Sequence, residues 1–211
     1  MAAQGRQFVS DRWRTTLALL VIPVVSGCAS LAPIEPATHV YSGRFAASVS
    51  HGETREAVSG RFTLAINPAR TTLDLASPLG NTLARVQTGA AGTVLTAPRA
   101  DGSLATWKGN SPDALAEAVL GFSLPVSGLA DWIAGRPVPD RPAHLSPDSG
   151  QPRRIEQDGW VIVIEDRFEE TGAPRRLTFD RRADASTGPS IQLRLVLDVP
   201  ETTTEQDRFR Q

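Results

Sequence analysis

The sequence predicts a mainly β domain, an antiparallel sheet with one helical insertion. Apolar and polar residues alternate in segment after segment, the pattern of strands with one buried face. The connections between these segments are short, so consecutive strands are expected to pair as hairpins. Only residues 111–135 have helical spacing, too little helix for a parallel sheet. We expect about seven to ten strands.

The first two strands are predicted to form one hairpin. The string SGRF occurs at residues 42 and 59, and each copy begins an alternating run, at residues 45–49 and 62–66. The segment between the runs is polar and contains glycine, which predicts a turn. The two copies are therefore the arms of a hairpin rather than a tandem repeat.

The same alternation predicts the remaining strands. In the clearest of them, every second residue from Ile191 to Val199 is apolar. The six further segments are residues 71–76, 81–86, 92–97, 159–168, 175–180 and 190–199.

Two short helices are predicted between the strands. Ser111 is a good N-cap, Pro112 suits the first helical position, and Gly121 can end the helix in a left-handed conformation. A second helix is expected at residues 126–134, ended by Gly135. Each helix carries an apolar stripe, so both should lie against the concave face of the sheet.

Composition excludes several classes of function. The chain has 211 residues, 40% of them hydrophobic, and fits one domain with appendages. Its 22 basic and 23 acidic residues are scattered, which argues against nucleic-acid binding. The three histidines, His39, His51 and His144, have no ligand-like neighbours, so no metal site is predicted. No catalytic constellation or cofactor motif is recognisable, and we expect neither an enzyme nor a cofactor.

Residues 1–27 have the pattern of an export signal. Arg6, Arg12 and Arg14 make the start basic. The apolar run at residues 15–25 is interrupted by Pro23 and is too short to anchor the chain across a bilayer.

The only cysteine follows this signal. The string VSGC ends at Cys28 and resembles the bacterial lipobox, in which the cysteine becomes the acylated N-terminus. The alternative is an incidental cysteine. Residues 28–40 contain two prolines and are expected to be a tether, followed by a folded domain at 41–200 and a flexible tail at 201–211.

One leucine violates the patterning. Pro78 and Gly80 predict a tight turn between two strands, but Leu79 between them has no turn chemistry. Two interpretations remain open: Leu79 is exposed for function, or it folds back under its own turn as a packing plug.

The order of these segments resembles the LolB family of outer-membrane lipoprotein receptors. The resemblance extends from Gly43 to Val199, and its most specific part is GFSLPVSGLADWIAGRPVP at residues 121–139. It implies a curved antiparallel sheet that forms an incomplete, half-open β-barrel, with short helices covering the mouth of an apolar cavity.

The resemblance also implies a function. The protein would be a monomer that accepts acylated lipoprotein cargo from the periplasmic lipoprotein carrier LolA and inserts it among outer-membrane phospholipid. Acylated Cys28 would anchor it on the periplasmic face of the outer membrane, because residue 29 is alanine and not the aspartate that retains lipoproteins in the inner membrane.

Two groups of site residues follow from the resemblance. Leu79, held by Pro78 and Gly80, matches the family's membrane-insertion loop. The acyl-chain cavity is expected to be lined by Phe45, Phe62, Leu64, Leu73, Leu75, Leu115, Val119, Leu129, Trp132, Ile133 and Trp160.

Two other functions compete with the receptor. One is a structural or assembly lipoprotein that scaffolds envelope proteins, and the other is a lipoprotein enzyme with a scattered site. An unfilled apolar cavity that opens beside Leu79 would favour the receptor, and a fully packed core would favour the scaffold.

Overall fold

The computed structural model describes residues 37–146, 153–182 and 189–199. The predicted signal at 1–27, Cys28, most of the tether and the tail at 201–211 lie outside the described residues. The helices are α1 (Pro112–Leu120) and α2 (Val126–Ile133). The strands are β1 (His39–His51), β2 (Thr54–Ile66), β3 (Arg70–Ala76), β4 (Thr82–Gly89), β5 (Gly92–Pro98), β6 (Leu104–Gly109), β7 (His144–Leu145), β8 (Arg154–Gln157), β9 (Trp160–Arg167), β10 (Pro174–Arg181) and β11 (Ser190–Leu197).

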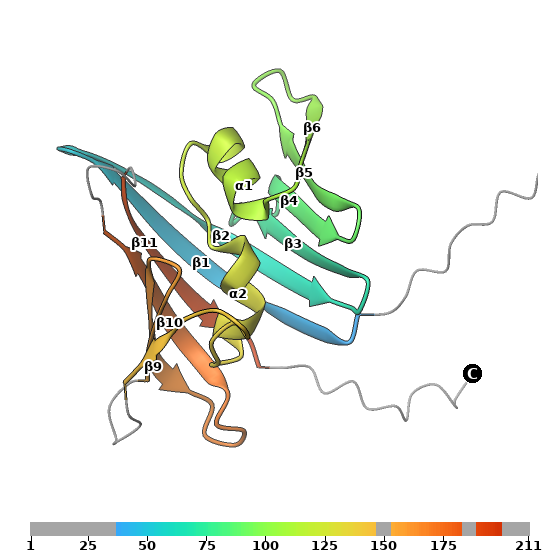
Figure 1. Ribbon diagram of the computed structural model, residues 1–211. Helices are drawn as coiled ribbons and strands as arrows, with labels where there is room; N and C mark the ends of the chain where they lie inside the picture. Colours follow the sequence, from blue (N-terminus) through green and yellow to red (C-terminus); the bar gives the residue numbers. More distant parts are fainter. Residues whose placement is uncertain (1–36, 147–152, 183–188, 200–211) are drawn as a thin grey trace, which may run out of the picture. The chain divides into compact units, whose positions relative to one another are not determined.

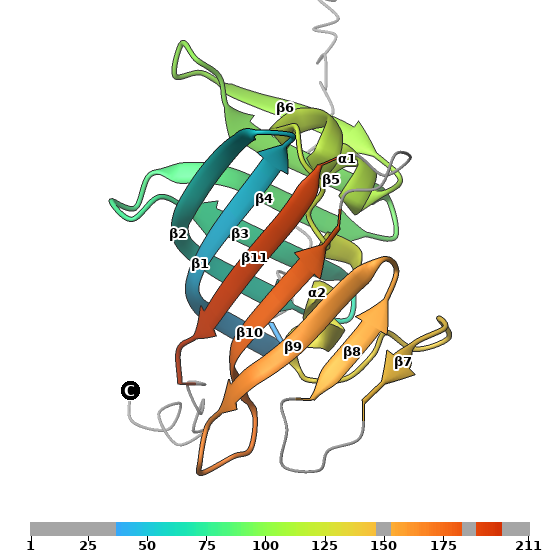
Figure 2. The same cartoon turned by 90° about the vertical axis from the view of Figure 1, so that its left-hand side faces the viewer.

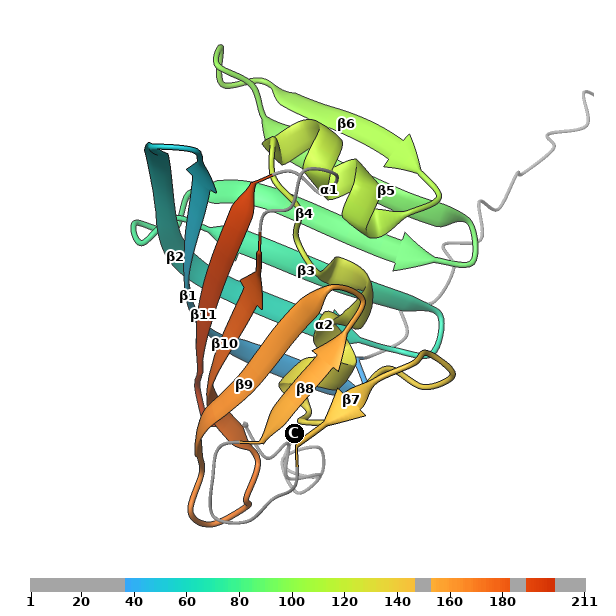
Figure 3. The ribbon, with the colours of Figure 1, turned by 60° about the vertical axis from the view of Figure 1, so that its left-hand side comes forward.

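All strands belong to one antiparallel sheet that does not close. The order is β6-β5-β4-β3-β2-β1-β11-β10-β9-β8-β7, so the first and last strands of the chain pair in the middle and β6 and β7 form the edges. Both helices lie in the connection between these edges, on the concave side of the curved sheet (Figures 1 and 3). The predicted half-open barrel is confirmed. Neither described helix is long and apolar enough to cross a membrane.

The eleven strands of the described chain exceed the seven to ten expected. The additional strands carry a weak period-two signal. In β8 the two inward residues are Ile155 and Gln157, so a buried polar side chain interrupts the pattern. In β6 the inward positions hold Ala105 and Trp107, and the outward positions include Leu104, so apolar residues do not mark one face.

The two helices begin and end where the sequence predicts. The Ser111 hydroxyl accepts a hydrogen bond from the Ala114 N–H (3.2 Å), and Gly121 ends α1 with a φ of 79°. The second helix ends at Ile133, one residue before its expected end. Helix α1 packs on β4, β5 and β6, and its partly buried Leu115 contacts the core.

The repeated SGRF string joins the two longest strands closely. Phe45 of β1 lies opposite Gly60 of β2, and Gly43 lies opposite Phe62. A Cβ atom on Gly60 would lie 3.0 Å from Phe45 Cε1 and only 1.9 Å from the Ala76 carbonyl oxygen. Each glycine therefore makes room for the phenylalanine of the other strand and for a neighbouring backbone.

The fit around Gly60 yields a stability prediction. Gly60→Ala should lower the free energy of unfolding by about 1–3 kcal/mol, because the added methyl forces the backbone at Ala76 to shift. Urea denaturation measures the change. Gly109→Ala is the control, because its nearest contact, with Leu115, would be an ordinary 3.6 Å. Equal losses in the two variants would contradict the role of close packing.

Candidate functional site

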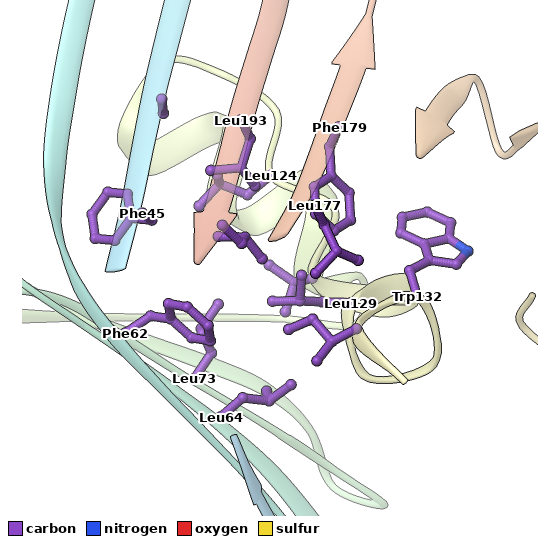
Figure 4. Packing of buried hydrophobic residues seen from close by; sticks show 14 of the residues in the cluster. Phe45, Phe62, Leu64, Leu73, Leu124, Leu129, Trp132, Leu177, Phe179 and Leu193 are labelled. Atoms are coloured by element: carbon purple, nitrogen blue, oxygen red, sulfur yellow. The ribbon is translucent and has the colours of Figure 1, made fainter. Parts of the chain in front are cut away.

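An apolar cavity of about 240 Å³ lies between the inner face of the sheet and the helical segment. Strands β1 to β4 and β11 form its walls, and residues 120–129 cover it. A cavity with an entirely apolar lining stays dry and accepts apolar ligands. Figure 4 shows Phe45 and Phe62 on the strands and Leu124 and Leu129 on the helical segment facing this interior. The lining is Phe45, Ala47, Val58, Phe62, Leu73, Leu75, Leu83, Ala84, Leu120, Phe122, Leu124, Pro125, Val126, Leu129, Leu193 and Leu195.

The pairing register opens a notch at one end of this cavity. Strands β2 and β3 pair only as far as Arg61 and Ala76, so residues 54–60 of β2 continue beside β1 alone. Three cavity residues, Val58, Leu75 and Leu83, lie around this notch. Val58 is 36% exposed, so the cavity reaches the surface here.

One hydrogen-bonded pair holds the start of the helical cover. Helix α2 follows Pro125, whose side chain has no atom that can accept a hydrogen bond from the first turn of the helix. Asp113, in the first turn of α1, accepts hydrogen bonds from the Ser127 N–H (2.8 Å) and the Ser127 hydroxyl. The carboxylate therefore caps α2 from the neighbouring helix and joins the two helices.

A buried glutamine holds the other end of the cover. The Trp132 Nε1–H and the Val138 N–H both donate to Gln157 Oε1, each at 2.8 Å. Gln157 Nε2 in turn donates to the carbonyl oxygens of Val138 (3.0 Å) and Arg141 (3.2 Å). Four hydrogen bonds thus attach α2 and the following chain to β8.

Five of the predicted cavity residues line the cavity, and six do not. The five are Phe45, Phe62, Leu73, Leu75 and Leu129. The six outside it are Leu64, Leu115, Val119, Trp132, Ile133 and Trp160. All six pack in or against the hydrophobic core. Trp132 lies over Gly128 and against Phe179, with ring centroids 6.3 Å apart, and anchors α2 rather than bordering the space.

Sequence reasoning missed eleven lining residues, among them Leu120, Phe122, Leu124, Pro125 and Val126 at the connection between the helices, where no period-two or helical stripe marks an inner face. The small Ala47 and Ala84 stand on the inner face among larger side chains, and their size leaves room. Leu193 and Leu195 lie on the inner face of the clearest predicted strand, but their proximity to the helices depends on the β1–β11 pairing. The alanines among larger apolar residues on the inner faces of β1 and β4 were the sequence signal that could have indicated unfilled space.

The turn between β3 and β4, which carries Leu79, projects from the sheet past β2 (Figure 2). The Ser77 N–H donates to the Asn81 carbonyl (2.7 Å), and the Gly80 N–H donates to the Ser77 carbonyl (2.9 Å). Gly80 adopts a φ of 88°, which favours glycine. Leu79 at the tip is 90% exposed, so the alternative in which it is a packing plug is wrong.

A second turn of the chain has the same hydrogen bonds with a polar tip. In the β5–β6 turn the Arg99 N–H donates to the Ser103 carbonyl (2.7 Å), and the Gly102 N–H donates to the Arg99 carbonyl (2.9 Å). The residue that corresponds to Leu79 is Asp101. Hydrogen bonds from the Ser103 hydroxyl and N–H lower its pKa below the ordinary value. This backbone geometry therefore does not require a leucine, and the exposure of Leu79 has no local structural reason.

The described residues contain no group of three or more His, Cys, Asp or Glu side chains that could hold a metal ion. Cys28, the predicted lipid-attachment residue, lies outside them. The geometry of the described residues therefore presents an apolar cavity, a notch and an exposed leucine.

Comparisons with known proteins agree on one family. The model of the family described as outer membrane lipoprotein LolB matches residues 38–199. The outer-membrane lipoprotein LolB of Bordetella petrii is 39% identical over 210 residues, which cover 95% of this chain and all of the relative. The LolB protein of Cupriavidus metallidurans is 34% identical, and the match covers 88% of this chain and 95% of the relative. The LolB protein of Bordetella pertussis is 38% identical, and the match covers 90% of this chain and 94% of the relative.

The glutamine anchor yields a second stability prediction. Gln157→Leu should lower the free energy of unfolding by at least about 2 kcal/mol, because it leaves the Trp132 and Val138 donors buried without partners. Chemical denaturation followed by tryptophan fluorescence measures the loss. Gln192→Leu removes a hydrogen bond to Asp180 on the outer face, where water can replace it, and should cost less than about 1 kcal/mol. Similar costs for both variants would refute the anchoring role.

Proposed function

This chain belongs to the LolB family of outer-membrane lipoproteins, and from that premise we propose that it is an outer-membrane lipoprotein receptor. It takes lipoproteins from the periplasmic carrier LolA and inserts them into the outer membrane. The observation that carries the proposal is the apolar cavity that reaches the surface beside the exposed Leu79 turn.

The cavity would receive the acyl chains of the cargo. Each buried methylene contributes about 0.8 kcal/mol, and the lining supports this burial because all of its residues are apolar. A volume of about 240 Å³ lies below the roughly 300–1,000 Å³ of pockets that hold drug-sized ligands. The cavity must therefore widen for an acyl chain. The segment at residues 121–125 is the part to move, since it connects α1 to α2 without belonging to either helix; its Ser123 hydroxyl accepts a hydrogen bond from Arg181 (2.7 Å), which this movement would break.

Transfer needs no bond-making step and no cofactor. A ligand moves between two sites only down a difference in affinity, so acyl chains pass from carrier to receptor to bilayer if each is a better environment than the last. The cavity should bind them loosely enough for release. Its incomplete cover and its surface opening at Val58 support such weak retention.

The receptor would act from the membrane surface as a monomer. Removal of residues 1–27 leaves Cys28 as the acylated N-terminus. The predicted tether is shorter than 28–40, because His39 and Val40 already belong to β1 of the folded domain. Several acyl chains on one residue hold a protein stably to a membrane. The tether lets Leu79 reach the outer-membrane phospholipid on the periplasmic face.

Leu79→Glu should separate uptake from delivery. The variant should accept lipoprotein from LolA normally, because Leu79 is exposed and does not line the cavity. Delivery to liposomes should fall by about tenfold or more, since burying a leucine side chain contributes about 1.5–3 kcal/mol. Both steps can be measured with purified carrier and vesicles.

Leu104→Glu is the matched control for this experiment. Leu104 is 66% exposed, on edge strand β6, so the substitution makes the same chemical change on a different exposed leucine. Delivery should stay close to that of the unsubstituted protein. Normal delivery by Leu79→Glu would refute the role of the turn, and failure of the unsubstituted protein to accept lipoprotein from LolA would refute the receptor.

Cys28→Ala should abolish stable membrane attachment. Without the acylated cysteine the chain loses its anchor, and the contact made by the leucine turn is too weak to replace several acyl chains. Fractionation of cell envelopes, followed by detection of the protein, measures the loss. Recovery of the variant in the outer-membrane fraction would show that another part of the chain anchors it.

A further inference from the structure

Four exposed arginines gather on the outer, convex face of the sheet. Arg44 of β1 lies directly opposite Arg61 of β2. On the other side of β1, Arg44 lies opposite Val196 of β11, and Val196 lies opposite Arg176 of β10. Arg194 is two residues along β11 on the same face. We name Arg44, Arg61, Arg176 and Arg194 the arginine patch.

These four charges have almost no partners within the described chain. Arg61 has an Asp198 oxygen at 3.9 Å, and the other three side chains make no ion pair or hydrogen bond with a described residue. Elsewhere on the same face, cross-strand partners neutralise one another. Arg85 pairs with Asp74 across β3 and β4.

Like charges directly opposite each other destabilise a strand pair. The Arg44–Arg61 pair is therefore unfavourable for the isolated protein and becomes favourable beside negative charge. The whole chain carries a net charge of −1, so this excess is a local feature of one face. The arrangement indicates an anionic binding partner.

The position of the patch identifies the partner. Arg61 lies opposite Ala76, the last residue of β3, and the turn that carries Leu79 begins at the next residue. The row of arginines across β10, β11, β1 and β2 thus leads to this turn, which projects past β2 in Figure 2. The leucine turn therefore continues from the point where the row of arginines ends at Arg61.

We infer that the arginine patch binds the phosphate groups of phospholipid headgroups while Leu79 enters the bilayer beside them. The inference rests on the proposed function, because it assigns the surface that the leucine turn contacts. Guanidinium groups are suited to phosphate by their planar, bidentate geometry. The patch lies on an open sheet face with charges on neighbouring strands, which suits a layer of headgroups.

Vesicle binding by the mature chain tests the inference. Cys28→Ser removes the anchor, which would otherwise hide the contact of the folded domain. This protein should bind vesicles of phosphatidylcholine and phosphatidylglycerol more tightly than vesicles of phosphatidylcholine alone. Arg44→Gln with Arg61→Gln should weaken binding to the mixed vesicles by about tenfold or more, since each basic side chain near an anionic surface contributes about fivefold.

The control removes the same charge elsewhere. Arg70 and Lys108 are exposed and lie at the strand ends away from the Leu79 turn. The Cys28→Ser protein that also carries Arg70→Gln and Lys108→Gln should bind the mixed vesicles nearly as tightly as the Cys28→Ser protein alone. Circular dichroism and thermal unfolding check that both double variants fold. Relief of the Arg44–Arg61 repulsion should leave the unfolding temperature unchanged or raised.

Three results would overturn the inference. Equal weakening in both double variants would show an effect of net charge alone. Equal binding to the two kinds of vesicle would show that the leucine turn acts without headgroup contacts. Loss of lipoprotein uptake from LolA with normal vesicle binding would assign the patch to the carrier. Uptake is measured in parallel, so a failure of headgroup binding with normal uptake leaves the receptor function intact.

Discussion

The structure depends on covering the apolar face of a sheet whose edges do not meet. Strands β6 and β7 are unpaired with each other, so the helical segment between them is the cover. Hydrogen bonds hold it at three places: Asp113 accepts from Ser127, Ser123 accepts from Arg181, and Gln157 accepts from Trp132. Between these attachments the cover spans the inner face without filling it. The cavity is therefore a consequence of where the helices are attached.

The register of the sheet connects this cavity to the exposed leucine. Strand β2 continues past the end of β3 from Gly60 onward. At Gly60 the Ala76 carbonyl oxygen lies so close to the backbone of β2 that no side chain fits there. The notch beyond that point exposes Val58, and the neighbouring β3–β4 turn carries Leu79. One change in strand pairing thus brings an opening and an exposed leucine side chain together.

The period of two along each strand divides the domain into an apolar inside and a charged outside. Phe45 faces the cavity, and its neighbour Arg44 faces solvent on the same strand. Such a division suits a protein that works at a bilayer, because acyl chains and headgroups need opposite environments. The Leu79 turn lies beside the notch, where the apolar inner face and the charged outer face meet.

Local chemistry was readable from the sequence. The capped helix from Ser111 to Gly121, the alternating strands and the tight turn at Pro78 and Gly80 all depend on residues close together in the chain, whereas the exposure of Leu79 was decided by the structure. The sequence did not predict strand β8, because its inward Gln157 looks polar until its partners are known. Trp132 likewise looked like a cavity wall and is an anchor. Periodicity determines which side chains are buried, and only the tertiary structure decides which buried side chains touch one another and which border an empty space.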